Sequence, residues 1–116
     1  MTLNIAIAGA GGRMGRMLID AVSENEACTL SGALEHEASP LLGQDAGLLV
    51  GNETLGVSVS SDRSVAFAGA DVIIDFTLPA ATLENMQAAR DVGAAVVLGT
   101  TGHTETQESE IGRAHV

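Results

Sequence analysis

The sequence LNIAIAGAGGRMG at residues 3–15 decides the fold, because an apolar run gives way to glycines and then to a helical pattern. Residues 5–8 show no polar alternation, which predicts a central parallel strand covered on both faces. Arg13, Arg16 and Asp20 are expected on the solvent side of the helix, with Arg16 and Asp20 one turn apart. The expected apolar face of that helix consists of Met14, Met17, Leu18, Ala21 and Val22.

The glycines between this strand and helix match a loop that binds a diphosphate. Gly9 suits a tight turn, Gly12 a close backbone approach to the diphosphate, and Gly15 close packing of the helix on the strand. Gly11 is an extra glycine in this pattern. The free amides and positive dipole end of a helix that begins near Gly12 would face the anion. A plain turn is the alternative, because glycine triplets are common in turns.

A second apolar stretch, at residues 28–34, ends in Glu35, about 20 residues beyond Gly15. Dinucleotide-binding folds place an acid at this distance, where it accepts hydrogen bonds from the adenosine ribose. The alternative for Glu35 is a solvated loop carboxylate. The spacing favours the ribose contact.

Composition restricts the class of protein. With 116 residues, 46% of them hydrophobic, the chain is expected to be one soluble globular domain or part of one. It contains no apolar stretch long enough to span a bilayer and no basic N-terminal signal. Its single cysteine, Cys28, predicts neither a disulfide framework nor a metal site, so a cytoplasmic location is expected.

The charge balance argues against nucleic acid as a partner. The chain has no lysine and a formal net charge of −10, so no basic stripe can replace the counterions of a phosphate backbone. An anionic cofactor must therefore be held locally, by the helix N-terminus and by Arg13.

The remaining chain alternates between strand and helix patterns. Residues 36–52 predict an irregular loop with at most one short helical turn. A weak strand is expected at 57–60, followed by a short helix that Asp62 caps and that runs to Ala68. Strands are expected at 72–76 and 94–98, separated by a helix that starts at Pro79 and stops at Gly93.

This alternation predicts an α/β fold, a Rossmann-like doubly wound parallel sheet of five strands. Ligands of such sheets bind beyond the carboxyl ends of the strands. Three loops are expected to converge there: residues 9–15, Phe76 with Thr77, and residues 99–102. An ordinary turn with a helix cap is the alternative for residues 99–102.

Five blocks of sequence, in order, resemble the N-terminal, cofactor-binding domain of the 4-hydroxy-tetrahydrodipicolinate reductase (dihydrodipicolinate reductase) family of bacterial lysine biosynthesis. They are residues 5–15, GALE at 32–35, LGQDAG at 42–47, DVIIDFT at 71–77 and GTTG at 99–102. The resemblance covers nearly the whole chain. It implies an enzyme that reduces 4-hydroxy-tetrahydrodipicolinate to tetrahydrodipicolinate with NADH or NADPH, in the diaminopimelate route to lysine.

The resemblance also implies site residues. Glu35 would bind the adenosine ribose, and the Phe76-Thr77 turn would border the cofactor. Position 36 is often an arginine in the family, where it meets the 2′-phosphate of NADPH. Here it is His36, a weaker phosphate partner, so NADH use is expected at least as readily as NADPH use. The phosphate residues would be Gly9, Ala10, Gly11, Gly12, Arg13 and Met14, and those on the nicotinamide side Gly99, Thr100 and Thr101.

Members of the resembled family continue into a second domain that binds the dicarboxylate substrate and carries the catalytic residues. We therefore expect a truncated dinucleotide-binding domain at residues 1–110, incomplete at its C-terminus, with no catalytic and no metal-binding residue of its own. Residues 111–116 are interpreted as a non-native tail, a sequencing artefact. His103 and His115 receive no role. The full-length parent is expected to be a homo-oligomer.

Two classes of function stay open at this point. The chain is the cofactor half of a reductase, inactive by itself, or it is a free-standing nucleotide-binding module with a regulatory or redox-sensing role. The reading frame downstream would distinguish them, because only the reductase continues into a catalytic domain.

Overall fold

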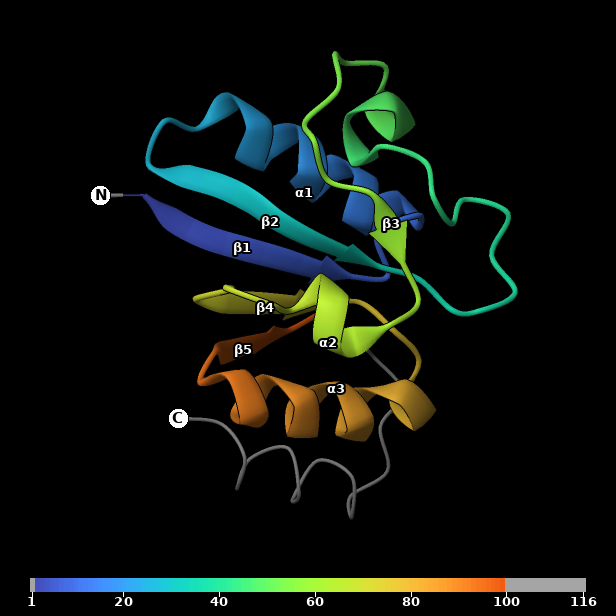
Figure 1. Cartoon of the computed structure of the whole chain (residues 1–116), viewed down its shortest axis with the longest axis vertical. Helices are drawn as coiled ribbons and strands as arrows, with labels where there is room; N and C mark the ends of the chain where they lie inside the picture. The colour runs from blue at the N-terminus through green and yellow to red at the C-terminus, as the bar shows by residue number, and fades with distance from the viewer. Residues whose placement is uncertain (1, 100–116) are drawn as a thin grey trace.

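The computed structural model describes residues 2–99, which form one five-stranded parallel sheet with helices on both faces (Figure 1). The strands lie in the order β3-β2-β1-β4-β5, so the chain winds outward from β1 in both directions. This confirms the predicted doubly wound sheet. The strands are β1 (Leu3–Ala8), β2 (Cys28–Leu34), β3 (Val59–Ser60), β4 (Val72–Asp75) and β5 (Ala95–Leu98). The helices are α1 (Arg13–Glu24), the 3-10 helix η1 (Ala46–Val50), α2 (Arg63–Ala66) and α3 (Pro79–Val92).

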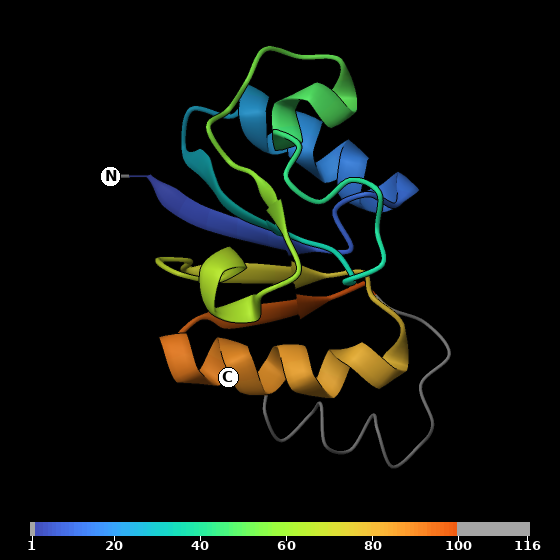
Figure 2. The same cartoon turned by 45° about the vertical axis from the view of Figure 1, so that its right-hand side comes forward.

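The sheet separates two apolar cores. Helix α1 and η1 cover one face, and α2 and α3 cover the other, as Figures 1 and 2 show from two directions. Ile7 and Ile19 lie in the core beneath α1, whereas Phe67 and Ile73 lie in the core beneath α2 and α3. Strand β1 is buried from Ile5 to Ala8, as its unbroken apolar run predicts. In residues 2–99 we find no helix with the length and apolar character that a membrane span requires.

The predicted apolar face of α1 is correct for Val22, which is buried, and for Leu18, which packs against the core. It is wrong for Met14, Met17 and Ala21, which are exposed, and it omitted the buried residues Gly15 and Ile19. The helix is rotated because Gly15 must face the end of β1. A side chain at position 15 would overlap the carbonyl oxygen of Gly9, so only a glycine allows this approach.

Arg16 and Asp20 bind other partners instead of pairing with each other. Arg16 donates from Nε to the Gly11 carbonyl at 2.9 Å and from Nη1 to the Leu49 carbonyl at 3.3 Å. Asp20 accepts a hydrogen bond from Asn52 at 2.9 Å. The hydrogen bond from Arg16 to Leu49 and the one from Asn52 to Asp20 therefore attach the segment around η1 to α1.

The segment between β2 and β3 is mostly irregular, as predicted, and η1 is its one helical turn. Asp45 holds it together: Oδ1 accepts from the amides of Gly47 and Leu55, and Oδ2 accepts from the amide of Gly56, each at 2.8 Å. Strand β3 is shorter than the expected strand 57–60, because Val57 and Ser58 pair with this segment rather than with β2.

The other element ends follow local sequence signals. Asp62 caps α2 by accepting from the amide of Ser64, although α2 ends at Ala66 and not at Ala68. Pro79 occupies the first turn of α3, and Gly93 ends it with a φ of 74°, a conformation that favours glycine. The proposed tail at 111–116 and His103 lie outside the described residues.

We predict that Asp45→Asn lowers the melting temperature of the chain at about pH 7 and that the difference begins to narrow below about pH 4 and continues to narrow as the pH falls further. The Leu55 amide, and then those of Gly47 and Gly56, hold the pKa of Asp45 below its ordinary value of 3.8, against the opposing effect of burial. A depressed pKa stabilises the fold above the ordinary value, and this contribution is lost as the pH falls through the lower, folded-state pKa. Thermal unfolding across this pH range measures it.

Glu53→Gln is the control, because it removes one carboxylate from the same segment at an exposed position. An equal loss of stability in both variants, or a loss from Asp45→Asn that is as large in acid as at about pH 7, would contradict the role given to Asp45.

Candidate functional site

The loop after β1 places the start of α1 at the carboxyl edge of the sheet. Gly9 has a φ of 84°, which favours glycine, and its amide and that of Ala10 both donate to the Leu34 carbonyl at the end of β2. Because position 15 is a glycine, the backbone of α1 contacts the backbone at the end of β1. Any side chain at position 15 would overlap the Gly9 carbonyl. The turn at Gly9 and the close packing at Gly15 are thus both present.

Gly12 is different, because nothing in the described chain requires a glycine there. Its φ of −75° and ψ of 170° are accessible to any residue, and an added Cβ would meet only the Gly9 carbonyl, at 3.5 Å. Gly12 is the N-cap of α1 and has no side chain to cap it. The amides of the first turn, including those of Arg13 and Met14, have no carbonyl one turn earlier in the helix. They can therefore bind an anion.

Gly11, the extra glycine of the sequence pattern, has a structural reason of its own. A side chain there would overlap Leu41 and would come within 3.1 Å of Glu35 Oε2. The amide of Gly11 donates to that same oxygen at 2.7 Å. This bond orients Glu35, whose side chain is only 12% exposed, and directs its Oε1 toward the exposed His36, with 3.9 Å between Oε1 and Nε2.

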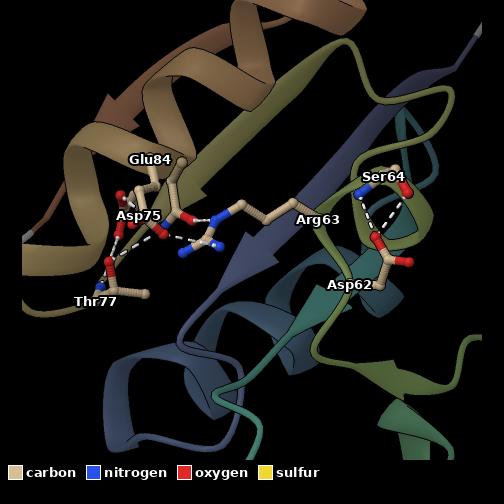
Figure 3. A network of polar contacts seen from close by, with 7 residues as sticks. Asp62, Arg63, Ser64, Asp75, Thr77 and Glu84 are labelled. Carbon is tan, nitrogen blue, oxygen red and sulfur yellow. Dashed lines mark hydrogen bonds and ion pairs between the residues drawn. The ribbon is translucent and has the colours of Figure 1, made fainter.

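The opposite side of the site is the turn after β4, which a buried carboxylate holds in place. Asp75 is fully buried, and its Oδ1 accepts from both the amide and the hydroxyl of Thr77. Asn85 on α3 is also fully buried and donates from Nδ2 to Asp75 Oδ2 at 3.2 Å and to Thr77 Oγ1 at 3.1 Å (Figure 3). The side chain of Thr77 is therefore fixed from two sides.

These segments enclose a single cleft of about 740 Å³, within the size range of small-molecule sites. The predicted site residues that line it are Gly9, Gly11, Gly12, Glu35, His36, Phe76 and Thr77. Ala10 is fully buried instead, and Arg13 and Met14 are exposed on the first turn of α1. Gly99 lies against Phe76, whose ring occupies the space that a side chain at position 99 would need. Thr100 and Thr101 lie outside the described residues.

Other residues line the cleft without having been identified from sequence: Leu34, Glu37, Ser39, Leu41, Ser61, Arg63, Leu78, Ala81, Glu84 and Asn85. Ser61 and Arg63 could have been found, since they follow the carboxyl end of a predicted strand. Glu84 and Asn85 lie in the second turn of α3 and carry no such signal, because the packing of α3 decides which of its residues reach the cleft.

The charged residues around the cleft are mostly acidic. Glu35, Glu37 and Glu84 line it, and Arg63 is the permanent cation among the described lining residues. An anionic ligand in this cleft must therefore be held by directed hydrogen bonds from backbone amides rather than by the overall field of the protein.

Comparison with known proteins matches residues 3–115 to the family model "Dihydrodipicolinate reductase, N-terminus". The 4-hydroxy-tetrahydrodipicolinate reductase of Cupriavidus necator is 53% identical over 112 residues, which cover 97% of this chain and 42% of that protein. The same enzyme of Pelobacter propionicus is 50% identical over 102 residues, 88% of this chain and 38% of that protein. The chain thus spans about two fifths of the length of these curated relatives.

Among solved structures, dipicolinate-bound dihydrodipicolinate reductase from Paenisporosarcina sp. TG-14 aligns with a TM-score of 0.73 and 25% identity, covering 98% of this chain and 43% of that one. Aspartate semialdehyde dehydrogenase of Candida albicans shares the fold, with a TM-score of 0.68 and 14% identity over 87% of this chain and 30% of that one. With its glycine loop, its acid at the end of β2 and these matches, the chain belongs to the dihydrodipicolinate reductase family and corresponds to the N-terminal part of its members.

Proposed function

We propose that this chain is the cofactor-binding part of a reductase that converts 4-hydroxy-tetrahydrodipicolinate to tetrahydrodipicolinate, in the diaminopimelate route to lysine, with NADH or NADPH. The observation that carries the proposal is the cleft in which the glycine loop, Glu35 and Thr77 meet, in a chain of this family. The bound cofactor supplies a hydride to the substrate.

The residues present fit a dinucleotide. Gly12 leaves open the space beside the first turn of α1, where amides of Arg13 and Met14 would donate to the diphosphate. Glu35 keeps Oε2 on the Gly11 amide, so Oε1 is directed to accept from a ribose hydroxyl. The Phe76-Thr77 turn, held by Asp75, would border the cofactor on the far side.

The substrate site belongs, in this proposal, to the part of the parent protein beyond this chain. The curated relatives are more than twice as long as the matched region. The solved relative named above binds dipicolinate, a flat cyclic dicarboxylate, and we extend this class of substrate to the parent. We further propose that the parent is a cytoplasmic homo-oligomer.

The first prediction for this site is that Gly12→Val abolishes NADH binding while the chain still folds. The backbone at position 12 accepts a β-branched residue, but its side chain would fill the space that the diphosphate needs. Calorimetric titration with NADH measures binding, and circular dichroism measures folding.

Ala21→Val is the matched control, because it adds the same branched side chain at an exposed position of α1. NADH binding by Gly12→Val at the affinity of the parent chain would show that the diphosphate does not lie beside Gly12.

The second prediction concerns cofactor choice: NADH binds at least as tightly as NADPH. Glu35 favours a free 2′-hydroxyl, and the imidazole of His36 is a weaker partner for a 2′-phosphate than the guanidinium of an arginine. Calorimetric titrations of the chain with both cofactors under the same conditions measure this. His36→Arg should favour NADPH.

An NADPH affinity well above that for NADH in the unaltered chain would contradict this assignment of His36.

The third prediction is that the chain as given binds the cofactor but oxidises none of it in the presence of the dicarboxylate substrate. Hydride transfer requires an acceptor positioned near the nicotinamide and a proton donor for its developing charge, and both are proposed to lie elsewhere in the parent. Turnover is measured as the decrease in the absorbance band of the reduced nicotinamide as NADH is oxidised. Rates comparable to those of a full-length relative would place the catalytic residues within this chain.

A further inference from the structure

The conformation of Arg63 is unusually well defined for an arginine at the edge of a cleft. It starts α2 and reaches across to α3, where Nε donates to Asn85 Oδ1 at 2.6 Å and Nη1 lies 3.1 Å from Glu84 Oε2 (Figure 3). The two hydrogen bonds from Asn85 Nδ2 to Asp75 and Thr77 fix the amide, so its oxygen must face Arg63. The side chain of Arg63 is 32% exposed, and its guanidinium is therefore held in one orientation at the cleft.

Arg63 lies across the cleft from the glycine loop. The loop leads into α1 on one face of the sheet, whereas α2, which begins at Arg63, and α3 lie on the other face (Figure 1). The carboxyl end of β2 adjoins this second wall, because the amide of Glu35 donates to the Ser60 carbonyl just before α2. The cleft thus runs from the loop, past Glu35, to Arg63.

The order of groups in a dinucleotide then decides what reaches Arg63. With the diphosphate at the start of α1 and the ribose at Glu35, the purine extends from the side of the ribose that faces away from the diphosphate. The part of the cleft left for it is lined by Ser61, Arg63, Leu78, Ala81 and Glu84. Leu78 is 78% exposed there, which gives an apolar surface for a flat ring.

The chemistry of this wall suits a base better than a phosphate. Glu84 already balances the charge of Arg63, so an added phosphate would face a paired cation beside further carboxylates. A guanidinium plane, in contrast, stacks on an aromatic base even when its edge is hydrogen-bonded. The contacts of Nε and Nη1 hold the plane of the guanidinium in a fixed orientation, in which its flat surface can stack on a base.

We propose that Arg63 is the residue that recognises the purine of the bound dinucleotide, by stacking its guanidinium on the base, and that Asn85 is the positioning residue that orients it. The proposal rests on the proposed function. It assigns the cofactor contact to the far wall of the cleft, at a residue that belongs to none of the sequence blocks described above.

The test compares Arg63→Met, Arg63→Lys and the control Arg90→Met, which removes a cation from an exposed position that does not line the cleft. Each variant of the full chain is titrated calorimetrically with ADP-ribose, nicotinamide mononucleotide and inorganic pyrophosphate. We expect Arg63→Met to weaken ADP-ribose by about fivefold or more, with the other two ligands unchanged. Arg63→Lys should recover little of this loss, since an ammonium keeps the charge but has no plane.

Three results would overturn the proposal. The first is an ADP-ribose affinity that is unchanged in Arg63→Met. The second is an equal loss of affinity for pyrophosphate in that variant, which would indicate general electrostatics. The third is full recovery of the ADP-ribose affinity in Arg63→Lys, which would make charge alone sufficient. If the unaltered chain binds no NADH, the proposed function is contradicted. If the unaltered chain binds NADH but no more tightly than Arg63→Met does, only this inference is contradicted.

A measurement on the unaltered chain does not depend on how the variants fold. In a proton-nitrogen NMR spectrum, stacking should shift the Arg63 Nε proton upfield when ADP-ribose is added and not when ribose 5-phosphate is added. The chain has five basic residues, all of them arginines, so the Nε signals are few. Absence of the shift at saturating ADP-ribose would refute the stacking.

Discussion

The contact between Gly15 of α1 and the backbone at the end of β1 is the constraint on which the rest of the structure depends. No side chain fits between them, so the helix begins directly against the strand and its first turn points along the carboxyl edge of the sheet. The rotation that this contact imposes on α1 exposes Met14 and Met17 and buries Ile19. It also directs Arg16 toward Gly11 and Leu49, which attaches the irregular segment around η1 to the same helix.

Two carboxylates then position the two sides of the cleft through the hydrogen bonds that they accept. Glu35 accepts from the Gly11 amide, so the end of β2 and the glycine loop hold each other in place. Asp75 accepts from Thr77 and Asn85, so the end of β4 and α3 do the same on the far side. Directed hydrogen bonds of this kind keep their geometry in an acidic protein, where general electrostatic attraction for an anion is absent.

The parts of the fold that could be predicted are those that short-range signals specify. The unbroken apolar run of β1, Pro79 at the start of α3 and Gly93 at its end each depend on a few neighbouring residues. Hydrophobic spacing placed only part of the apolar face of α1, because backbone packing at Gly15 outweighed the burial of two methionines. The predicted length of strand β3 was too long for a similar reason, since Ser58 pairs with Asp45 and not with a residue of β2.

The sequence by itself determined the doubly wound topology, the glycine loop and the acid at Glu35, because alternating strand and helix patterns and the spacing to that acid are properties of the chain order. Only the tertiary structure decided that Gly11 is needed for Leu41 and Glu35, that Gly32 has to admit the carbonyl of Ala66, and that Arg63 reaches Asn85. These contacts join residues that are far apart in sequence. Their partners become known only when the two faces of the sheet have been packed.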